Sequence, residues 1–195
     1  MPLERVDTKK EFTIFDACRK CDVERAMEYL APKDGERGSV TEPDSNQMTL
    51  LHHAAFGGNE TIVQALVECP GVPIDAVDAL GWTPLMYAAA HGHATACQLI
   101  LDGGANTSAK DDMKRTSLHL AVTSTSANTE QKVAAVRALL EGGVNPRLKN
   151  VAGMTARQTA EASGAPAEVI DALPAEAKPA PAPAASAAAP DDASA

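Results

Sequence analysis

The feature that most constrains the fold is a threonine-centred block that recurs along the chain at nearly constant spacing. The blocks begin at Thr49, Thr83, Thr116 and Thr155, so the intervals between them are 34, 33 and 39 residues. A repeat of this period is typical of elongated proteins in which each unit packs only on its neighbours. The longer third interval indicates an insertion in the Ser/Thr/Asn-rich stretch around residues 125–130.

The residues within each block predict a pair of short helices. Thr83 is a favourable helix N-cap, and Pro84 suits the first helical position because its missing N–H is not needed there. Glycine after the second helix favours a left-handed C-cap. Aromatic residues make up only 3% of the chain, so the core is expected to consist of small and aliphatic side chains. Pairs of small residues recur at a fixed distance after the threonine: Ala54-Ala55, Ala88-Ala89 and Ala121-Val122.

The most complete block resembles the ankyrin repeat. Gly81-Trp82-Thr83-Pro84-Leu85, followed by Ala88-Ala89 and Gly92-His93, matches the signature of that family. The resemblance extends over about residues 11–173. It implies an all-α solenoid of about five helical hairpins joined by β-hairpin-like loops. The expected units cover about residues 11–31, 47–78, 79–111, 112–150 and 151–173.

Both ends of the chain depart from the repeat. We expect residues 1–10 to form an N-terminal extension, and the first unit lacks the Thr-Pro pair. In the last unit Arg157 stands where other units carry leucine, as expected if its outer side faces water. Residues 174–195 are rich in proline and alanine, which predicts a disordered tail because proline blocks helix and little apolar area is available.

The composition narrows the class of partner and the compartment. A formal net charge of −9 disfavours nucleic acid and anionic membranes as partners. The chain begins without the apolar run of a secretory signal, and no stretch reaches the ~20 apolar residues that span a bilayer. The four cysteines are irregularly spaced, which argues against a disulfide framework. We therefore expect a cytoplasmic or nuclear protein that is a monomer when free.

No motif indicates catalysis or a metal site. Cys18 and Cys21 have the spacing of zinc and redox motifs, but the chain lacks a second such pair, and in the repeat register they take a core alanine and an inter-helix glycine position. The resemblance assigns His52 and His119 to hydrogen bonds between neighbouring units, and His93 to the start of a second helix. No nucleophile stands with a recognisable base. We therefore expect no metal, no cofactor and no enzymatic activity.

The resemblance implies that another protein binds along a concave face built from the hairpin tips and the first helices. That face carries the single Trp and one of two Tyr, and aromatic side chains are enriched at interface hot spots. The alternative for Trp82 is packing across the neighbouring hairpin. Aspartates on the same tips favour a partner with a basic patch. The predicted contact residues are Trp82, Tyr87, Phe56, His53, His91, Leu80, Met113, Arg115, Asp78, Asp111 and Asp112.

The function that these patterns favour is a protein-interaction module, either an adaptor or an inhibitory regulator. The alternative is a fixed structural subunit of a large assembly, which a broad apolar face would favour. An enzyme is the least favoured class, because it would need an unexpected polar pocket with perturbed titrating groups.

Overall fold

The computed structural model describes residues 13–31 and 40–175, and these residues form helices joined by turns, without a β-strand. The N-terminal extension predicted for residues 1–10 lies outside the described residues, as does the predicted tail apart from Pro174 and Ala175. Within the described residues the helices are α1 (Ile14–Arg19), α2 (Val23–Leu30), α3 (Leu50–Gly57), α4 (Glu60–Glu68), α5 (Pro84–His91), α6 (Ala94–Asp102), α7 (Ser117–Thr123), α8 (Thr129–Glu141), α9 (Ala156–Ala162) and α10 (Ala167–Asp171).

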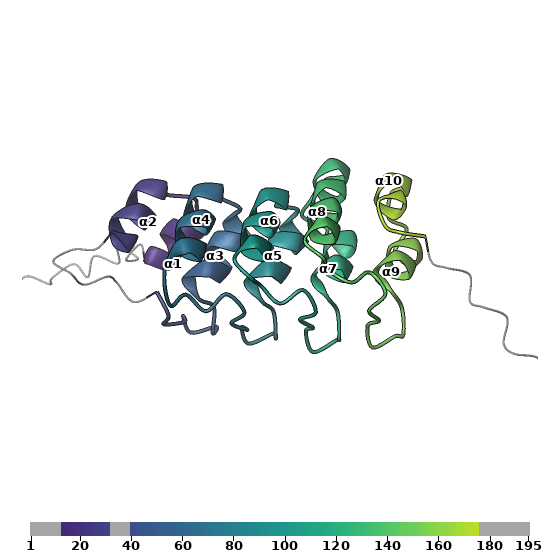
Figure 1. Ribbon diagram of the computed structural model, residues 1–195, viewed down its shortest axis with the longest axis horizontal. Coiled ribbons are helices and arrows are strands. Elements are labelled where there is room, and N and C mark those ends of the chain that lie inside the picture. The colour runs from purple at the N-terminus through teal and green to yellow at the C-terminus, as the bar shows by residue number, and fades with distance from the viewer. Residues whose placement is uncertain (1–12, 32–39, 176–195) are drawn as a thin grey trace, which may run out of the picture.

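The helices are arranged in two parallel rows (Figure 1). The first helices of the hairpins, α1, α3, α5, α7 and α9, each pack on the next in their row, and the second helices α2, α4, α6, α8 and α10 do the same. Long loops project together from the edge of the first-helix row, at the bottom of the view. This arrangement confirms the predicted helical solenoid.

Local sequence explains where the helices begin. The first helices α1, α3, α5, α7 and α9 follow threonine N-caps in extended conformation, and Pro84 occupies the first turn of α5. Gly58 and Gly92 follow α3 and α5 with φ of 75°, the left-handed geometry expected of a glycine C-cap. The insertion between the third and fourth blocks forms a short loop and a longer second helix, since α8 has 13 residues whereas α4 and α6 have nine.

The core runs along the whole stack instead of filling one centre. The small-residue pairs after each threonine are fully buried, which lets neighbouring first helices approach closely. Leu51, Leu85 and Leu118 hold equivalent positions, two residues after the threonine, and each is buried between units. Every interior hairpin therefore depends on both neighbours to cover its apolar faces.

Each hairpin loop is closed by one Asx residue. The backbone N–H of this residue donates to the carbonyl four residues later, at 2.9–3.1 Å, and its own Oδ1 accepts from the N–H groups two and four residues later. These bonds fix the tip as the expected β-hairpin-like turn. The four closing residues are Asp44, Asp78, Asp111 and Asn150.

Candidate functional site

The predicted contact residues centre on a group of aromatic rings where α3 and α5 meet the hairpin tip that precedes α5. The Tyr87 ring lies 5.0 Å from the Trp82 ring and 6.1 Å from the Phe56 ring, between centroids. The Phe56 ring in turn lies 4.2 Å from the imidazole of His91. We call these four residues, all partly exposed, the aromatic cluster.

Two arginines from flanking units lie against rings of the aromatic cluster. The Arg19 guanidinium lies 4.2 Å from the centre of the Phe56 ring, and that of Arg115 lies 5.7 Å from the centre of the Trp82 ring. Such cation–π contacts favour a fixed arrangement of rings and charges. Because Arg115 belongs to the next hairpin, Trp82 does pack across its neighbour, and it also stays partly exposed.

The Tyr87 side chain is fixed by a hydrogen bond to Asp78 in its own hairpin loop. Its hydroxyl donates to Asp78 Oδ2 at 2.6 Å, and burial, together with this hydrogen bond and the charge of Asp78, raises the pKa of Tyr87. The tyrosine therefore stays protonated and ties α5 to its own hairpin loop. Its ring supports the aromatic cluster more than it projects toward solvent.

Of the three aspartates predicted on the tips, only Asp112 is exposed. Asp78 and Asp111 are buried, where they close their own hairpins, and Asp111 also forms a 2.7 Å ion pair with Arg115 Nη2. Burial leaves these two carboxylates little freedom to meet a partner. The expectation of a basic partner rested on three exposed carboxylates, and only the carboxylate of Asp112 remains to support it.

His53, another predicted contact, lies inside the molecule. Its Nε2 lies 2.9 Å from Asp44 Oδ2, and its ring is 5.2 Å from that of Phe15. Burial alone would raise the pKa of Asp44, but hydrogen bonds from Met48, Asn46 and His53 outweigh it and lower the pKa. His53 thus joins the first unit to the second.

The remaining histidines link neighbouring hairpins as expected. Nδ1 of His52 accepts from the N–H of Thr49, and Nε2 donates 3.0 Å to the carbonyl of Trp82 in the next hairpin. His119 makes the same pair of contacts with Thr116 and Met154. His93 caps the start of α6, and its Nε2 lies 3.1 Å from the Phe56 carbonyl.

The cysteines take structural positions. Burial raises the pKa of the Cys18 and Cys97 thiols to about 12, so both stay unreactive thiols at neutral pH. Cys21 occupies the inter-helix glycine position with φ of 60°, and its thiol lies 3.3 Å from the Gly57 carbonyl. Over residues 13–31 and 40–175 no three His, Cys, Asp or Glu side chains gather as metal ligands would.

Exposed apolar side chains gather on the hairpin tips. Leu80 and Met113, both predicted, are joined by Val77 and Val151, which the sequence reasoning missed; all four side chains are more than half exposed. Val151 could have been found from its place in the tip, four residues before the block threonine. Met27, on α2, is the one other large apolar side chain that is exposed in the described part of the chain.

Comparison with known proteins agrees with the stacked hairpins. Residues 58–150 match the family model for ankyrin repeats in three copies. The chain is 32% identical over 108 residues to Dauer abnormal formation protein 25 of Caenorhabditis elegans, which covers 55% of this chain and 27% of the relative. It is 34% identical over 115 residues to the Transient receptor potential cation channel subfamily A member 1 homolog of the same organism, covering 59% of this chain and 9% of the relative.

A third relative is Ankyrin repeat, SAM and basic leucine zipper domain-containing protein 1 of Saimiri boliviensis boliviensis, which is 36% identical over 91 residues, 47% of this chain and 19% of the relative. The chain thus spans at most 27% of the length of these three relatives. No helix in residues 13–31 and 40–175 has the length and apolar character needed to cross a membrane. The repeat motifs, the stacked hairpins and the sequence matches place the chain in the ankyrin-repeat family.

Proposed function

We propose that the chain is an adaptor or inhibitory module that binds a partner protein on its tip face. By tip face we mean hairpin loops 44–48, 75–82, 108–115 and 147–154, together with the adjoining exposed sides of the first helices. Ankyrin repeats generally mediate protein–protein interaction and are typically non-catalytic. The observation that carries the proposal is the aromatic cluster with an arginine against each of two of its rings, because aromatic and arginine side chains dominate interface hot spots.

Hydrogen bonds within the chain hold the tip face in shape without a partner. Asp78 fixes its loop through two backbone N–H groups and holds Tyr87 through a 2.6 Å hydrogen bond. A surface held in this way loses little side-chain entropy on association, which favours affinity. In this proposal Asp78, Asp111, His53 and Tyr87 hold the face in shape. The direct contacts come from Phe56, Trp82, His91, Leu80, Met113, Arg115 and Asp112.

The described surface favours a reversible regulator over a fixed subunit of a large assembly. A permanently buried interface is broad and apolar. Here the large exposed apolar side chains number five in the described residues, and four of them are confined to the tips.

Affinity capture with mass spectrometry tests the proposal, with the wild-type chain and Trp82→Ala as baits. We expect Trp82→Ala to weaken capture of a specific partner by about 2 kcal/mol or more, which is the scale of an interface hot spot. Gln98→Ala is the matched control, because Gln98 lies on α6 in the second-helix row and bonds only Asp102 within that helix. Tyr87→Ala is less suitable, since it also strips Asp78 of its hydroxyl donor.

Circular dichroism of each variant confirms that the helices are retained. Equal loss of capture in Trp82→Ala and Gln98→Ala, or loss in the control alone, would move the binding surface to the second-helix row and refute the proposal.

A further inference from the structure

The last three hairpin tips carry an apolar ridge formed by Leu80, Met113 and Val151. Their side chains are 60%, 51% and 57% exposed. Leu80 and Met113 hold the same place, three residues before their block threonines. The tips adjoin one another, because the Val151 N–H donates 3.0 Å to the Met113 carbonyl and Gly81 lies against Asp112. One side chain from each of three consecutive units therefore lines a continuous edge.

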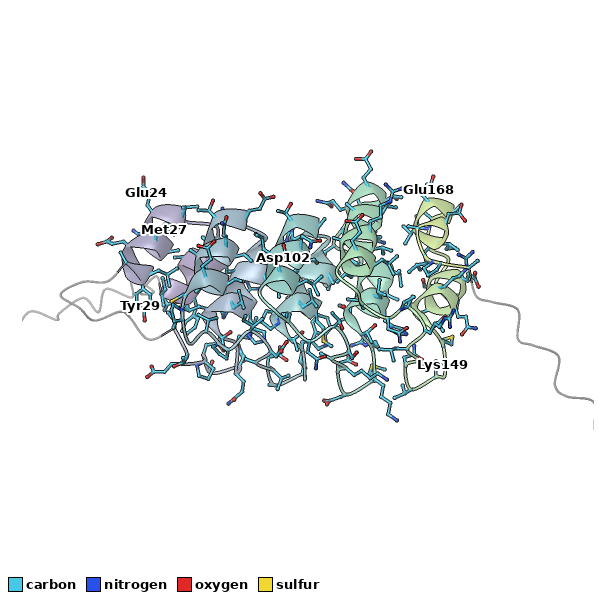
Figure 2. The ribbon with its side chains drawn as sticks, viewed as in Figure 1. Glu24, Met27, Tyr29, Asp102, Lys149 and Glu168 are labelled. Carbon is cyan, nitrogen blue, oxygen red and sulfur yellow. The ribbon has the colours of Figure 1, made fainter. Side chains whose placement is uncertain are left out.

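Positive charge flanks this ridge at its C-terminal end. Lys110, Lys114, Arg147 and Lys149 are exposed on the last two tips, and none forms an ion pair within the described residues. Lys149 points away from the body at the lower edge (Figure 2). The one exposed carboxylate on these two tips is Asp112.

The positive charge beside the ridge contrasts with the acidic character of the rest of the molecule. Residues 40–109 contain no Lys or Arg, and the full chain carries a formal net charge of −9. Acidic side chains such as Glu24 and Glu168 project from the opposite edge in Figure 2. The four cations therefore form a local basic patch on an acidic protein.

Lys114 supplies one of these charges from a backbone position that favours glycine. It has φ of 55°, and the equivalent residues Gly81 and Gly153 have φ of 72° and 74°. A left-handed conformation costs a non-glycine residue about 1–2 kcal/mol. Gln47 holds the same place in the first tip with φ of 65°, so the position accepts residues other than glycine, and at Lys114 that residue adds an exposed positive charge.

A cavity of about 390 Å³ opens beside the last tip. Arg147 and Lys149 lie on its wall with Thr155, Gln158 and the apolar Leu173. A cavity with this lining has room for a side chain that bears a carboxylate.

We propose that the ridge and its four cations bind an acidic protein segment that carries spaced apolar side chains. This inference rests on the proposed function and adds the chemistry of the partner. Apolar side chains of the segment would pack on Leu80, Met113 and Val151, while its carboxylates would meet the surrounding lysines. Because the rest of the chain is acidic, such a segment is repelled elsewhere, which favours one orientation of approach. A nucleic acid fits less well, since the ridge offers aliphatic side chains and not the aromatic platforms on which bases stack.

Selection from a displayed library of random peptides tests the inference on the full-length chain. We expect the enriched peptides to combine Asp or Glu with Leu, Ile or Phe. A fluorescently labelled copy of the best peptide is then titrated by anisotropy. The double variant Lys110→Glu/Lys149→Glu should bind the peptide at least about tenfold more weakly than the wild type. Arg137→Glu, a charge reversal at an exposed residue of α8, should bind it within about twofold of the wild-type affinity.

Lys114→Gly separates binding from folding. It should leave the melting temperature equal or higher, because it removes backbone strain. It should also weaken binding of the peptide by a few-fold, because it removes one positive charge. Leu80→Ser with Met113→Ser should weaken it by at least about tenfold, even at about 1 M salt, where charge interactions are screened beyond about 3 Å.

Several outcomes would overturn the inference. They are enrichment of basic peptides, equal affinity of the reversed variant and the wild type, or displacement of the peptide by a dT oligonucleotide at equal concentration. If the lysine reversals leave the affinity for the selected peptide unchanged but Trp82→Ala abolishes binding, the proposed function stands and the proposed partner chemistry is refuted. A peptide that no tip-face variant weakens would defeat both.

Discussion

The interior hairpins and the last hairpin carry residues of opposite character two places after the block threonine: a buried leucine in the interior and a partly exposed arginine in the last. Leu85, two residues after the block threonine, is 3% exposed because units on both sides cover it. Arg157 holds that position in the last unit and is partly exposed. Its Nη1 donates to the carbonyls of Ile170 and Leu173, both at 2.9 Å, and its Nε bonds Glu161. Within the described residues no later unit packs on this position, and the guanidinium there bonds carbonyls at the end of α10 and just after it.

The next position, three residues after the block threonine, also carries a different residue in the last unit. His119 caps its own helix with Nδ1 and reaches the following hairpin with Nε2. Gln158, its equivalent in the last unit, caps its own helix through a 3.1 Å bond from the Thr155 N–H. Gln158 therefore keeps the capping role that His119 has within its own helix.

The first unit differs at its inter-helix turn. Gly58 and Gly92 hold that turn in α3 and α5, but the first unit has Cys21 there, with φ of 60°. The departure is not confined to end units, because the interior helix α7 ends at Ser124 without such a glycine, whereas the last unit keeps Gly164 with φ of 69°. Substitutions at interior and end positions test how far each position depends on packing from both sides.

The largest effect is expected from Leu85→Ala. Removal of a leucine side chain from a well-packed core costs about 2–5 kcal/mol through lost transfer energy and the cavity left behind. Because each unit is stabilised by its neighbours, the loss should spread to adjacent repeats. Denaturant unfolding followed by circular dichroism measures it. A midpoint shift no larger than that of Gln98→Ala would show that the position is not covered on both sides.

Arg157→Ala should destabilise less, by about 1–2 kcal/mol, because it removes hydrogen bonds that water can partly replace at this partly exposed position. Arg157→Leu restores the interior residue and sharpens the comparison. We expect it to give no gain in the free energy of unfolding. A clear increase would mean that the last unit buries this position as an interior unit does.

The pH dependence of stability follows from two histidines that link hairpins and from one in the aromatic cluster. Burial lowers the pKa of His52, His91 and His119 below the ordinary value of 6.5. The unfolded chain then binds more protons than the folded one below that pH, so this contribution to stability is complete above pH 6.5 and is lost as the pH falls. Melting temperatures measured at falling pH should show the decrease.

His119→Gln should reduce that decrease, since glutamine does not titrate and Gln158 shows that it can cap the helix. An identical pH profile for the variant and the wild type would assign the titration to other groups.

The smallest effect is expected from Cys21→Gly. Glycine removes the left-handed strain but adds entropy to the unfolded chain, so the net gain should be about 0.5–1 kcal/mol. Gly92→Ala is the opposite control in the interior. Its added Cβ would lie 2.6 Å from the Ala127 Cβ at φ of 75°, so it should destabilise. Both are measured by chemical unfolding, and loss of stability in Cys21→Gly would show that the Cys21 thiol contributes more than its backbone costs.

The candidate site was only partly predictable. The register placed Trp82, Leu80 and Met113 on hairpin tips from position alone, and their exposure agrees with that placement. Charge misled the sequence reasoning at Asp78 and Asp111, because polar residues usually lie at the surface. Their burial follows from the two backbone N–H groups that each accepts within its own loop.

The sequence by itself determined the helical hairpins, their order and the residues that cap them. These features depend on local preferences that recur with the blocks, such as the threonine N-cap before a first helix and glycine with positive φ in the turns. Only the tertiary structure decided which polar side chains face solvent. Val151 and Lys149 join the surface of Met113 because their hairpins stack, and Tyr87 turns its hydroxyl to Asp78 because burial requires a hydrogen-bond partner. Contacts between units set these outcomes, and no local pattern in one repeat specifies its neighbour.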